Sequence, residues 1–561
     1  MTTAHDDGEG QTQLDRCRSA VREDDRNPEA YIALAKCHWR LRQSEEAIAV
    51  LRQGLDQCAP STRLHEKYIK RLEMCNRTEE AIDAAQDAIR MFPDDVLLKL
   101  REATLLPALY DTPSQLEHYR NRFGERLGRL SEELRLDAPA ARQNALTAIG
   151  KDAFKYLGFQ GRNDRELQVL YGGLVHRIMA ANYPSWVQPL AMPPRAQDEK
   201  IRVAFVSSRF AHSSAMKTFG GWMRELDRKE FDVCAYHAAQ YTDAVTGQVR
   251  QWSGCFRQLP PDLKQMANAI RADRPHIVVF LDHGVDGIMT QLAALRFAPV
   301  QCMAWDNPVT SGLPTVDYFL SGALMEPMNA KDHYSETLVC LPGVGACYAK
   351  PVIPTALFSK TRRDFQIRDD AVAFLSGQSV FKHLPDQDEV YVRIARELPN
   401  SQFIFLVKRE LEHALHARLT RAFLASRLQP KRHVVLLPEQ RMFDYWNLLQ
   451  LSDMFLDTMG WSGGVSTMEA VACGVPVVTM PGAVMRGRQS YGILRQLGVT
   501  ETIASDKHHY VEIAVRLGRE PAWKSSVIER MKERWAHLYD DTRPARAMEE
   551  LFRRAAGGTL Q

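Results

Sequence analysis

The chain has 561 residues, more than one hydrophobic core usually supports, so we expect two to four domains. Its 72 basic and 69 acidic residues nearly balance, which gives no support for a nucleic-acid partner or for a role at a membrane surface. No apolar run approaches the ~18–20 residues that span a bilayer, no leader sequence is recognisable, and the cysteines are scattered. We therefore expect a cytoplasmic protein with reduced thiols and without membrane insertion.

Residues 1–15 are acidic and polar and are predicted to be disordered, whereas residues 16–190 are predicted to form a helical domain. Within it, small residues recur at an interval of 34 residues over about residues 28–95, which lets antiparallel helices pack closely and resembles the tetratricopeptide repeat. Because each repeat needs a stacked neighbour, we expect the repeats to dock on helices predicted over residues 114–136 and 140–183. The recurring positions are Ala47, Leu51 and Gly54, then Ala81, Ala85 and Ala88.

After a proline-containing break at residues 190–199, the hydrophobic period changes. Short apolar runs alternate with helical stretches, which predicts βαβ units and parallel sheets. A second break near residues 351–370 divides them into two doubly wound domains, residues 200–355 and 365–555, with helices over residues 522–555 closing the second domain. The predicted strands cover residues 201–206, 276–281, 300–304, 371–375, 403–407, 434–437, 454–456 and 476–479.

The most informative segment is residues 457–482. A glycine-rich turn (Gly463, Gly464) precedes two hydroxyl residues (Ser466, Thr467), and Glu469 follows on the first helical turn. In such a strand–loop–helix–strand unit, the loop and the helix N-terminus can hold a diphosphate, and a carboxylate can accept ribose hydroxyls. The segment therefore predicts a nucleotide-linked substrate.

Several segments together resemble a known family. Residues 200–555 resemble bacterial O-GlcNAc-transferase-like and SPINDLY-like glycosyltransferases, and the helical N-terminus resembles the repeats that those proteins carry. The resemblance implies a GT-B fold, in which two Rossmann-like domains face a cleft, preceded by an all-helical tetratricopeptide-like domain. It also implies transfer of a sugar from a nucleotide donor to a protein hydroxyl, with inversion and without a metal or other cofactor. The matching segments include IRVAFVSSRFAHSSA, HYSETLVCLPG, LPEQRMFDYWNLLQLSDMFLDT and WSGGVSTMEAVACGVPVVTMPG.

The resemblance also implies roles for residues of the second domain. Lys382 matches the lysine that contacts the diphosphate, where a mobile ammonium would follow the charge that develops on the leaving group. Gln378 precedes it in the same loop, and Arg488 is a weaker candidate for a phosphate contact. Glu469 matches the acidic residue that holds the ribose, and Tyr445 lies where the family places a group near the base.

In the first domain, His212 matches a histidine that would act as a base or would contact the sugar or the acceptor, so we place it in the cleft as a catalytic candidate and leave its role open. His283 is a candidate for the acceptor side of the cleft. The turn formed by Thr310, Ser311 and Gly312 is suited to bind the sugar or the phosphates.

Two departures from the family pattern stand near the expected donor. The glycine-rich loop lacks the His or Asn that the family commonly carries there. Asp306 and Asn307 precede Pro308, where the family often has Gly or His, and this change would alter the choice of sugar.

The leading hypothesis is a protein O-glycosyltransferase that uses UDP-GlcNAc and grips its acceptor protein through the helical repeats. Alternatives within the family are UDP-glucose, GDP-fucose or another donor, or asparagine as the acceptor. A non-catalytic scaffold with a degenerate GT-B region belongs to a different class, and so does a metabolite transferase or a sugar epimerase. Neither the acceptor protein nor the oligomeric state follows from the sequence.

Overall fold

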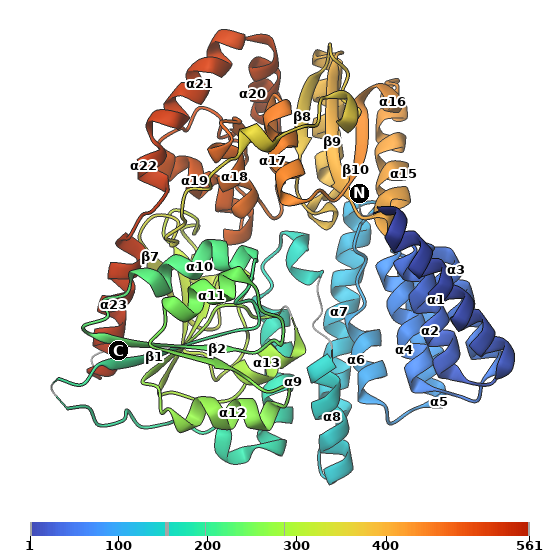
Figure 1. The fold of residues 1–561 in the computed structure, drawn as a ribbon, viewed down its shortest axis with the longest axis vertical. Coiled ribbons are helices and arrows are strands. Elements are labelled where there is room, and N and C mark those ends of the chain that lie inside the picture. Colours follow the sequence, from blue (N-terminus) through green and yellow to red (C-terminus); the bar gives the residue numbers. More distant parts are fainter. Residues whose placement is uncertain (1–2, 152–155, 197, 285, 559–561) are drawn as a thin grey trace. The chain divides into compact units, whose positions relative to one another are not determined.

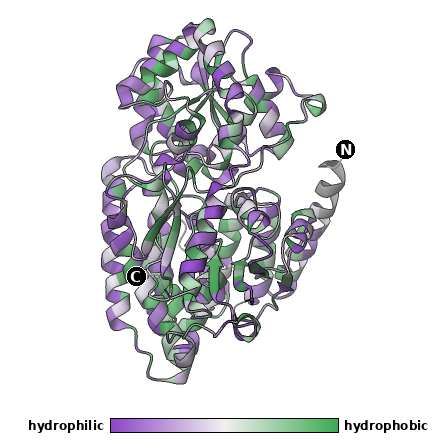
Figure 2. Ribbon diagram, turned by 90° about the vertical axis from the view of Figure 1, so that its left-hand side faces the viewer, coloured by the Kyte–Doolittle hydropathy of each residue, from purple (hydrophilic) through white to green (hydrophobic). Residues whose placement is uncertain are grey.

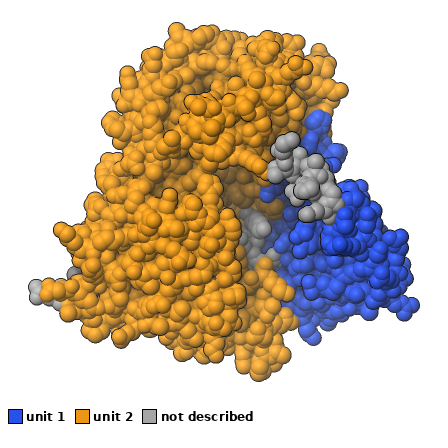
Figure 3. Space-filling model, in the orientation of Figure 1, with its two compact units in different colours: residues 1–135, 407–418 blue, residues 136–406, 419–561 orange. Residues whose placement is uncertain are grey.

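The computed structural model describes residues 3–151, 156–196, 198–284 and 286–558, with side chains from residue 10 onward. It divides into two compact units, residues 1–135 with 407–418 and residues 136–406 with 419–561 (Figure 3). Within the part of the chain so described, no helix combines the length and the apolar character needed to cross a membrane.

The smaller unit is made of antiparallel helix pairs, drawn in blue in Figure 1. The pair α2 (Pro28–Arg40) and α3 (Ser44–Gln57) is followed after 34 residues by the pair α4 (Thr62–Met74) and α5 (Thr78–Met91), which confirms the predicted repeat. Tyr31 packs against small residues of the same pair, because Ala35 and Ala47 leave room for its ring. The remaining helices of this unit are α1 (Thr3–Glu23), α6 (Val96–Thr104), α7 (Pro113–Glu133) and the start of α15 (Arg409–Ala425).

The N-terminal segment differs from the prediction of disorder over residues 1–15. From Thr3 onward the structure describes it as part of α1. Leu14 is only 1% exposed and, with Cys17, packs against Leu34 and Cys37 of α2. A buried apolar face thus extends the helical stack, although the acidic residues around it hide this face in the sequence.

The first sheet of the larger unit has seven parallel strands in the order β3-β2-β1-β4-β5-β6-β7. The order reverses between β1 and β4, and such a switch point opens a crevice at the carboxyl ends of the strands. Figure 2 shows helices striped with hydrophilic and hydrophobic residues, as expected where one face packs on a sheet. The strands are β1 (Ile201–Ser207), β2 (Phe231–His237), β3 (Cys255–Gln258), β4 (Ile277–Phe280), β5 (Val300–Ala304), β6 (Tyr318–Gly322) and β7 (Thr337–Leu341).

The second sheet has five strands in the order β10-β9-β8-β11-β12, with its own switch point between β8 and β11. Its strands are β8 (Val372–Ser376), β9 (Ser401–Val407), β10 (Val434–Pro438), β11 (Met454–Leu456) and β12 (Val477–Val478). The helices that accompany the two sheets are α10 (Ser214–Glu225), α11 (Ala244–Gln251), α12 (Leu263–Ala272), α13 (Gly287–Ala293), α14 (Asp388–Glu397), α16 (Pro430–His433), α17 (Met442–Leu451), α18 (Val465–Ala472), α19 (Gln489–Leu497), α20 (Lys507–Arg519), α21 (Pro521–Glu533) and α22 (Trp535–Leu538).

Two helices that the sequence assigns to the helical domain belong instead to the unit that contains the sheets. They are α8 (Pro139–Lys151) and α9 (Arg165–Asn182). The amide of Gln291 on α13 donates to the carbonyl of Leu146 on α8 at 2.7 Å. On α9, a Cβ added to Gly172 would lie 2.3 Å from the carbonyl oxygen of Gly312, so the two backbones touch.

The last helix, α23 (Arg543–Ala556), returns to the first sheet, which corrects the prediction that the C-terminal helices only close the second domain. Figure 1 shows it running beside α10 and β7. Phe552 packs edge-on against Phe231 of β2, and Arg553 forms an ion pair with Glu230 at 2.8 Å. Through α23, one stretch of chain ties the two sheets into a single unit.

The contact between α9 and the Thr310–Gly312 turn predicts opposite effects for two adjacent glycines. Gly172→Ala should destabilise the protein by about 1–3 kcal/mol, because the new methyl group overlaps the backbone of Gly312. Gly173 has nothing within 4 Å of an added Cβ, so Gly173→Ala should leave stability unchanged or raise it by up to about 1 kcal/mol. Urea unfolding of both variants measures the difference, and equal midpoints would contradict the close packing.

Candidate active site

Three predicted donor contacts of the second domain form one hydrogen-bonded chain. The loop after β8 carries Gln378 and Lys382, and Ser466 lies on the first turn of α18. The side-chain amide of Gln378 donates to Ser466 Oγ at 2.8 Å, and Lys382 Nζ donates to Gln378 Oε1 at 3.0 Å. The structure therefore brings together an ammonium, an amide and a hydroxyl at the carboxyl edge of the sheet, where ligands bind in doubly wound folds.

Lys382 lies in surroundings that disfavour its charge. Burial lowers the pKa of its ammonium to about 8, and the nearby Asp457 carboxylate acts in the opposite direction. The ammonium also lies 5.4 Å from the centroid of the Trp461 ring. A lysine with a lowered pKa gains more from an incoming anion than a fully hydrated one, since its own hydration is already lost.

Both glycines of the turn lie close to neighbouring polar side chains. A Cβ on Gly463 would lie 2.4 Å from the amide nitrogen of Gln378, and one on Gly464 would lie 2.5 Å from Oε1 of Gln489. The amide N–H of Gly463 donates to Asp457 at 2.7 Å. The turn is thus pressed against Gln378, which explains how a loop after β8 and a loop after β11 share one site.

Thr467 does not lie where the sequence placed it. It is fully buried, and its hydroxyl is 2.7 Å from the hydroxyl of Ser490. Ser490 in turn donates to the carbonyl of Gly463 at 3.0 Å. The predicted phosphate contact by Thr467 is therefore wrong for this structure, because its hydroxyl is bonded in the interior and supports the loop through Ser490. Ser466, by contrast, is partly exposed.

Glu469 forms an ion pair that the sequence analysis missed. Lys217, on α10 of the first domain, contacts the Glu469 carboxylate at 2.6 Å, and the two side chains are 27% and 7% exposed. The pair joins the two Rossmann-like domains. No local signal marks Lys217, since one lysine on an amphipathic helix is normally a solvated residue.

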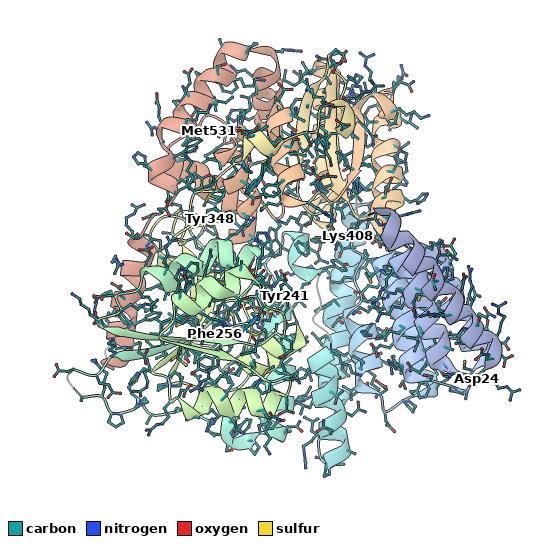
Figure 4. The ribbon with its side chains drawn as sticks, in the orientation of Figure 1. Asp24, Tyr241, Phe256, Tyr348, Lys408 and Met531 are labelled. Carbon is teal, nitrogen blue, oxygen red and sulfur yellow. The ribbon has the colours of Figure 1, made fainter. Side chains whose placement is uncertain are left out.

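A pocket of about 410 Å³ adjoins this ion pair. It is lined by α10, by the connection after β7 on which Figure 4 labels Tyr348, and by Met442 and Trp446 of α17. His212 is exposed at its rim, as expected for a cleft residue, and its backbone N–H donates to Asp243 at 2.7 Å. The pocket thus brings His212 and Glu469 to one space between the two domains.

Tyr445 lies close to the same region, on α17. A Cβ added to Gly377 would lie 3.1 Å from its hydroxyl, which is buried and has no hydrogen-bond partner among the described residues. Burial raises the pKa of this hydroxyl well above its usual value. The ring is half-buried, so it can still present an edge or a face to a ligand.

The Thr310–Gly312 turn is occupied by internal contacts. Thr310 Oγ donates to Glu336 at 2.5 Å, and the backbone N–H of Ser311 donates to the same carboxylate at 2.7 Å. Gly312 has a φ of 67° and touches α9. This turn therefore does not offer the predicted sugar or phosphate contacts, because Thr310 and Ser311 are both hydrogen-bonded to the buried Glu336.

Two further candidates are also turned away from the cleft. His283 is 5% exposed, and burial lowers its pKa to about 4, so it is a neutral interior residue rather than an acceptor contact. The guanidinium of Arg488 donates to the carbonyls of Met325 at 3.1 Å and Gly482 at 3.3 Å. These bonds fix two loops and leave the predicted phosphate contact unsupported.

Comparisons with known proteins identify the family and the fold. Residues 176–348 and 345–543 match the model of glycosyl transferase family 41. The chain belongs to this family. It is 28% identical over 384 residues to the probable UDP-N-acetylglucosamine–peptide N-acetylglucosaminyltransferase SPINDLY of Solanum lycopersicum, covering 66% of this chain and 40% of that protein. The corresponding Arabidopsis thaliana protein is 29% identical over 349 residues, or 60% of this chain and 36% of that one.

The chain therefore spans about two fifths of the length of these relatives. Among solved structures, a mutant of Thermobaculum terrenum O-GlcNAc transferase matches with a TM-score of 0.70 and 20% identity. The match covers 99% of this chain and 96% of that one. At this identity the likeness shows the fold, which is the GT-B type preceded by helical repeats.

The ion pair across this family 41 cleft predicts a measurable coupling energy. In a double-mutant cycle of Lys217→Met and Glu469→Gln, urea unfolding should give a coupling of about 1–3 kcal/mol, because a mostly buried carboxylate loses its ion-pair partner. The fully solvated pair Arg516–Glu520, with both side chains 52% exposed, is the matched control and should give about 0.3–0.5 kcal/mol. Equal coupling in the two cycles would mean that the cleft pair does not join the domains.

Proposed function

We propose that this family 41 protein is an inverting protein O-glycosyltransferase that moves GlcNAc from UDP-GlcNAc to a Ser or Thr hydroxyl of an acceptor protein. The observation that carries the proposal is the chain Lys382–Gln378–Ser466 beside the glycine-rich turn, with Glu469 one helical turn further along α18. A nucleoside diphosphate fits this order of groups, with its phosphates at the ammonium and its ribose at the carboxylate.

The chemistry needs charge stabilisation rather than covalent catalysis. As the bond between sugar and diphosphate breaks, negative charge grows on the diphosphate. Lys382 and the N-terminal N–H groups of α18 lie where they can stabilise that charge more in the transition state than in the ground state. On this account the leaving group needs no metal, and the nucleotide sugar is a substrate rather than a resident cofactor.

The acceptor would reach the sugar from the side of the first domain, where His212 borders the pocket. The helical repeats would hold the acceptor protein, since stacked helix pairs form extended binding surfaces. An asparagine acceptor, or a donor such as UDP-glucose or GDP-fucose, would use the same cleft with different contacts to the sugar.

A non-catalytic scaffold is the second candidate, and one observation favours it. Glu469, the proposed ribose ligand, is already bound by Lys217, so the cleft is closed at that point without a nucleotide. A scaffold would keep this pair permanently, whereas an enzyme must exchange it for ribose hydroxyls.

Nucleotide binding distinguishes the two candidates. UDP, GDP and CMP, each alone and with its sugars, should be tested by thermal shift, because a ligand that binds the folded state raises its Tm. We expect a rise with UDP and UDP-GlcNAc, together with UDP release from UDP-GlcNAc. The matched variant Glu469→Gln should weaken the UDP shift. Absence of a shift with every nucleotide would reject the enzyme and support the scaffold.

The lowered pKa of Lys382 predicts a pH limit on turnover. The ammonium is charged below its pKa of about 8 and neutral above it, so kcat/KM should fall as the pH rises through about 8. Lys382→Met should lower kcat about 10²–10³-fold, with a smaller effect on UDP affinity. Lys382→Arg, which stays charged, should retain part of the activity and lose the alkaline limb. An alkaline limb that persists in the arginine variant would assign it to another group.

A further inference from the structure

The carboxyl edge of the first sheet carries a cluster of charged residues outside the donor contacts described above. Arg209 follows β1, Asp282 follows β4, and Asp306 follows β5. These strands are adjacent in the sheet, and β1 and β4 flank its switch point. The cluster therefore lies where a doubly wound domain presents groups to a ligand.

The two carboxylates of this cluster are not equivalent. Asp282 is fully buried, and it accepts hydrogen bonds from the backbone N–H of Ser208 at 3.2 Å and from the Ser208 hydroxyl at 2.5 Å. These bonds hold Asp282 against the loop after β1. Asp306 is only half-buried, and Ser214, at the start of α10, lies near it. Asp306 is therefore the carboxylate of the pair that a substrate can reach.

The first turn of α10 connects Asp306 with the donor site. Ser214 lies near Asp306, and Lys217, three residues later, contacts Glu469. Residues three apart lie on the same face of a helix, about 4.5 Å apart along its axis. The first turn of α10 therefore lies near Asp306 at one residue and contacts the proposed ribose ligand at another.

We propose that Asp306 is the catalytic residue that accepts the proton of the hydroxyl that attacks the sugar. This assignment rests on the proposed glycosyltransferase function. In the step, the acceptor O–H bond breaks and its proton passes to the Asp306 carboxylate, while the acceptor oxygen forms a bond to the anomeric carbon. The bond from that carbon to the diphosphate oxygen breaks, and its electron pair leaves with UDP. The Asp306 carboxyl then returns the proton to solvent.

The electrostatics of the cluster suit this role. Burial raises the pKa of Asp306 to about 7, the Asp282 carboxylate acts in the same direction, and Arg209 and Ser214 act against it. A base whose pKa is near the working pH is ionised often enough to act and basic enough to hold the proton. An ordinary aspartate, with its lower pKa, would be a much weaker base.

The test uses the full chain and UDP release with water as the acceptor, so that no acceptor protein is needed. The donor is UDP-GlcNAc, or whichever donor of the thermal-shift panel the wild type turns over. In the wild type, kcat/KM should fall as the pH drops below about 7, since the protonated carboxyl cannot accept a proton. Asp306→Asn should lower kcat/KM about 10²–10⁴-fold and remove the acidic limb, with an unchanged Tm shift by UDP.

Three further variants separate this role from others. Asp306→Glu should recover part of the rate together with the acidic limb. Arg209→Met should move that limb to higher pH, because the guanidinium lowers the pKa of Asp306. His212→Gln is the matched control, because His212 is the other candidate base. This variant should still show the fall of kcat/KM below about pH 7, whatever its effect on KM.

The outcomes are distinguishable. An acidic limb that persists in Asp306→Asn and disappears in His212→Gln would overturn the assignment and make His212 the base. The assignment would also be overturned if Asp306→Asn kept kcat and the acidic limb of the pH profile but changed the preference between UDP-GlcNAc and UDP-glucose. Asp306 would then be a sugar contact. A wild type that shows neither a nucleotide-dependent Tm shift nor UDP release would overturn the proposed function, and this assignment with it.

Discussion

The shape of the donor site depends on the buried carboxylate of Asp457. This residue directly follows β11, and its two oxygens accept the N–H of Gly463 at 2.7 Å and the hydroxyl of Thr479 at 2.7 Å. It therefore holds the glycine-rich turn against the strand that follows α18. Burial raises the pKa of Asp457 to about 6, while Lys382 acts in the opposite direction. One carboxylate thus fixes the loop and also favours the charged form of the lysine proposed to meet the diphosphate.

Hydroxyl residues near the site serve two different purposes, and only the structure separates them. Ser466 and Thr467 are neighbours in a loop of the right composition, yet Ser466 contacts Gln378 whereas Thr467 is bonded to Ser490 in the interior. Thr310 and Ser311 likewise support a turn through the buried Glu336. A hydroxyl that a buried partner already satisfies gains little from a ligand, because binding would only exchange one hydrogen bond for another.

Sequence reasoning succeeded where the signal is local. Every apolar run predicted as a strand overlaps a strand of one of the two sheets, and the 34-residue spacing gives the helix pairs. It failed where the local signal is weak or the signal is tertiary. β2 reads FDVCAYH, and its polar residues break the apolar run. The position of α23 on the first sheet depends on tertiary contacts such as that of Phe552 with Phe231. Lys217 was missed for the same reason, since its importance lies in a partner 252 residues away.

The ion pair between Lys217 and Glu469 explains how the cleft can exist before a donor arrives. A carboxylate suited to ribose hydroxyls must be largely desolvated, and an unpaired buried carboxylate is costly. Lys217 supplies the missing positive charge from the opposite domain at 2.6 Å. Under the proposed function, a donor ribose that binds Glu469 would have to replace this ion pair. The helical turn that carries Lys217 also holds Ser214, which lies near Asp306, so the ion pair between the domains and the surroundings of this carboxylate depend on the same short segment.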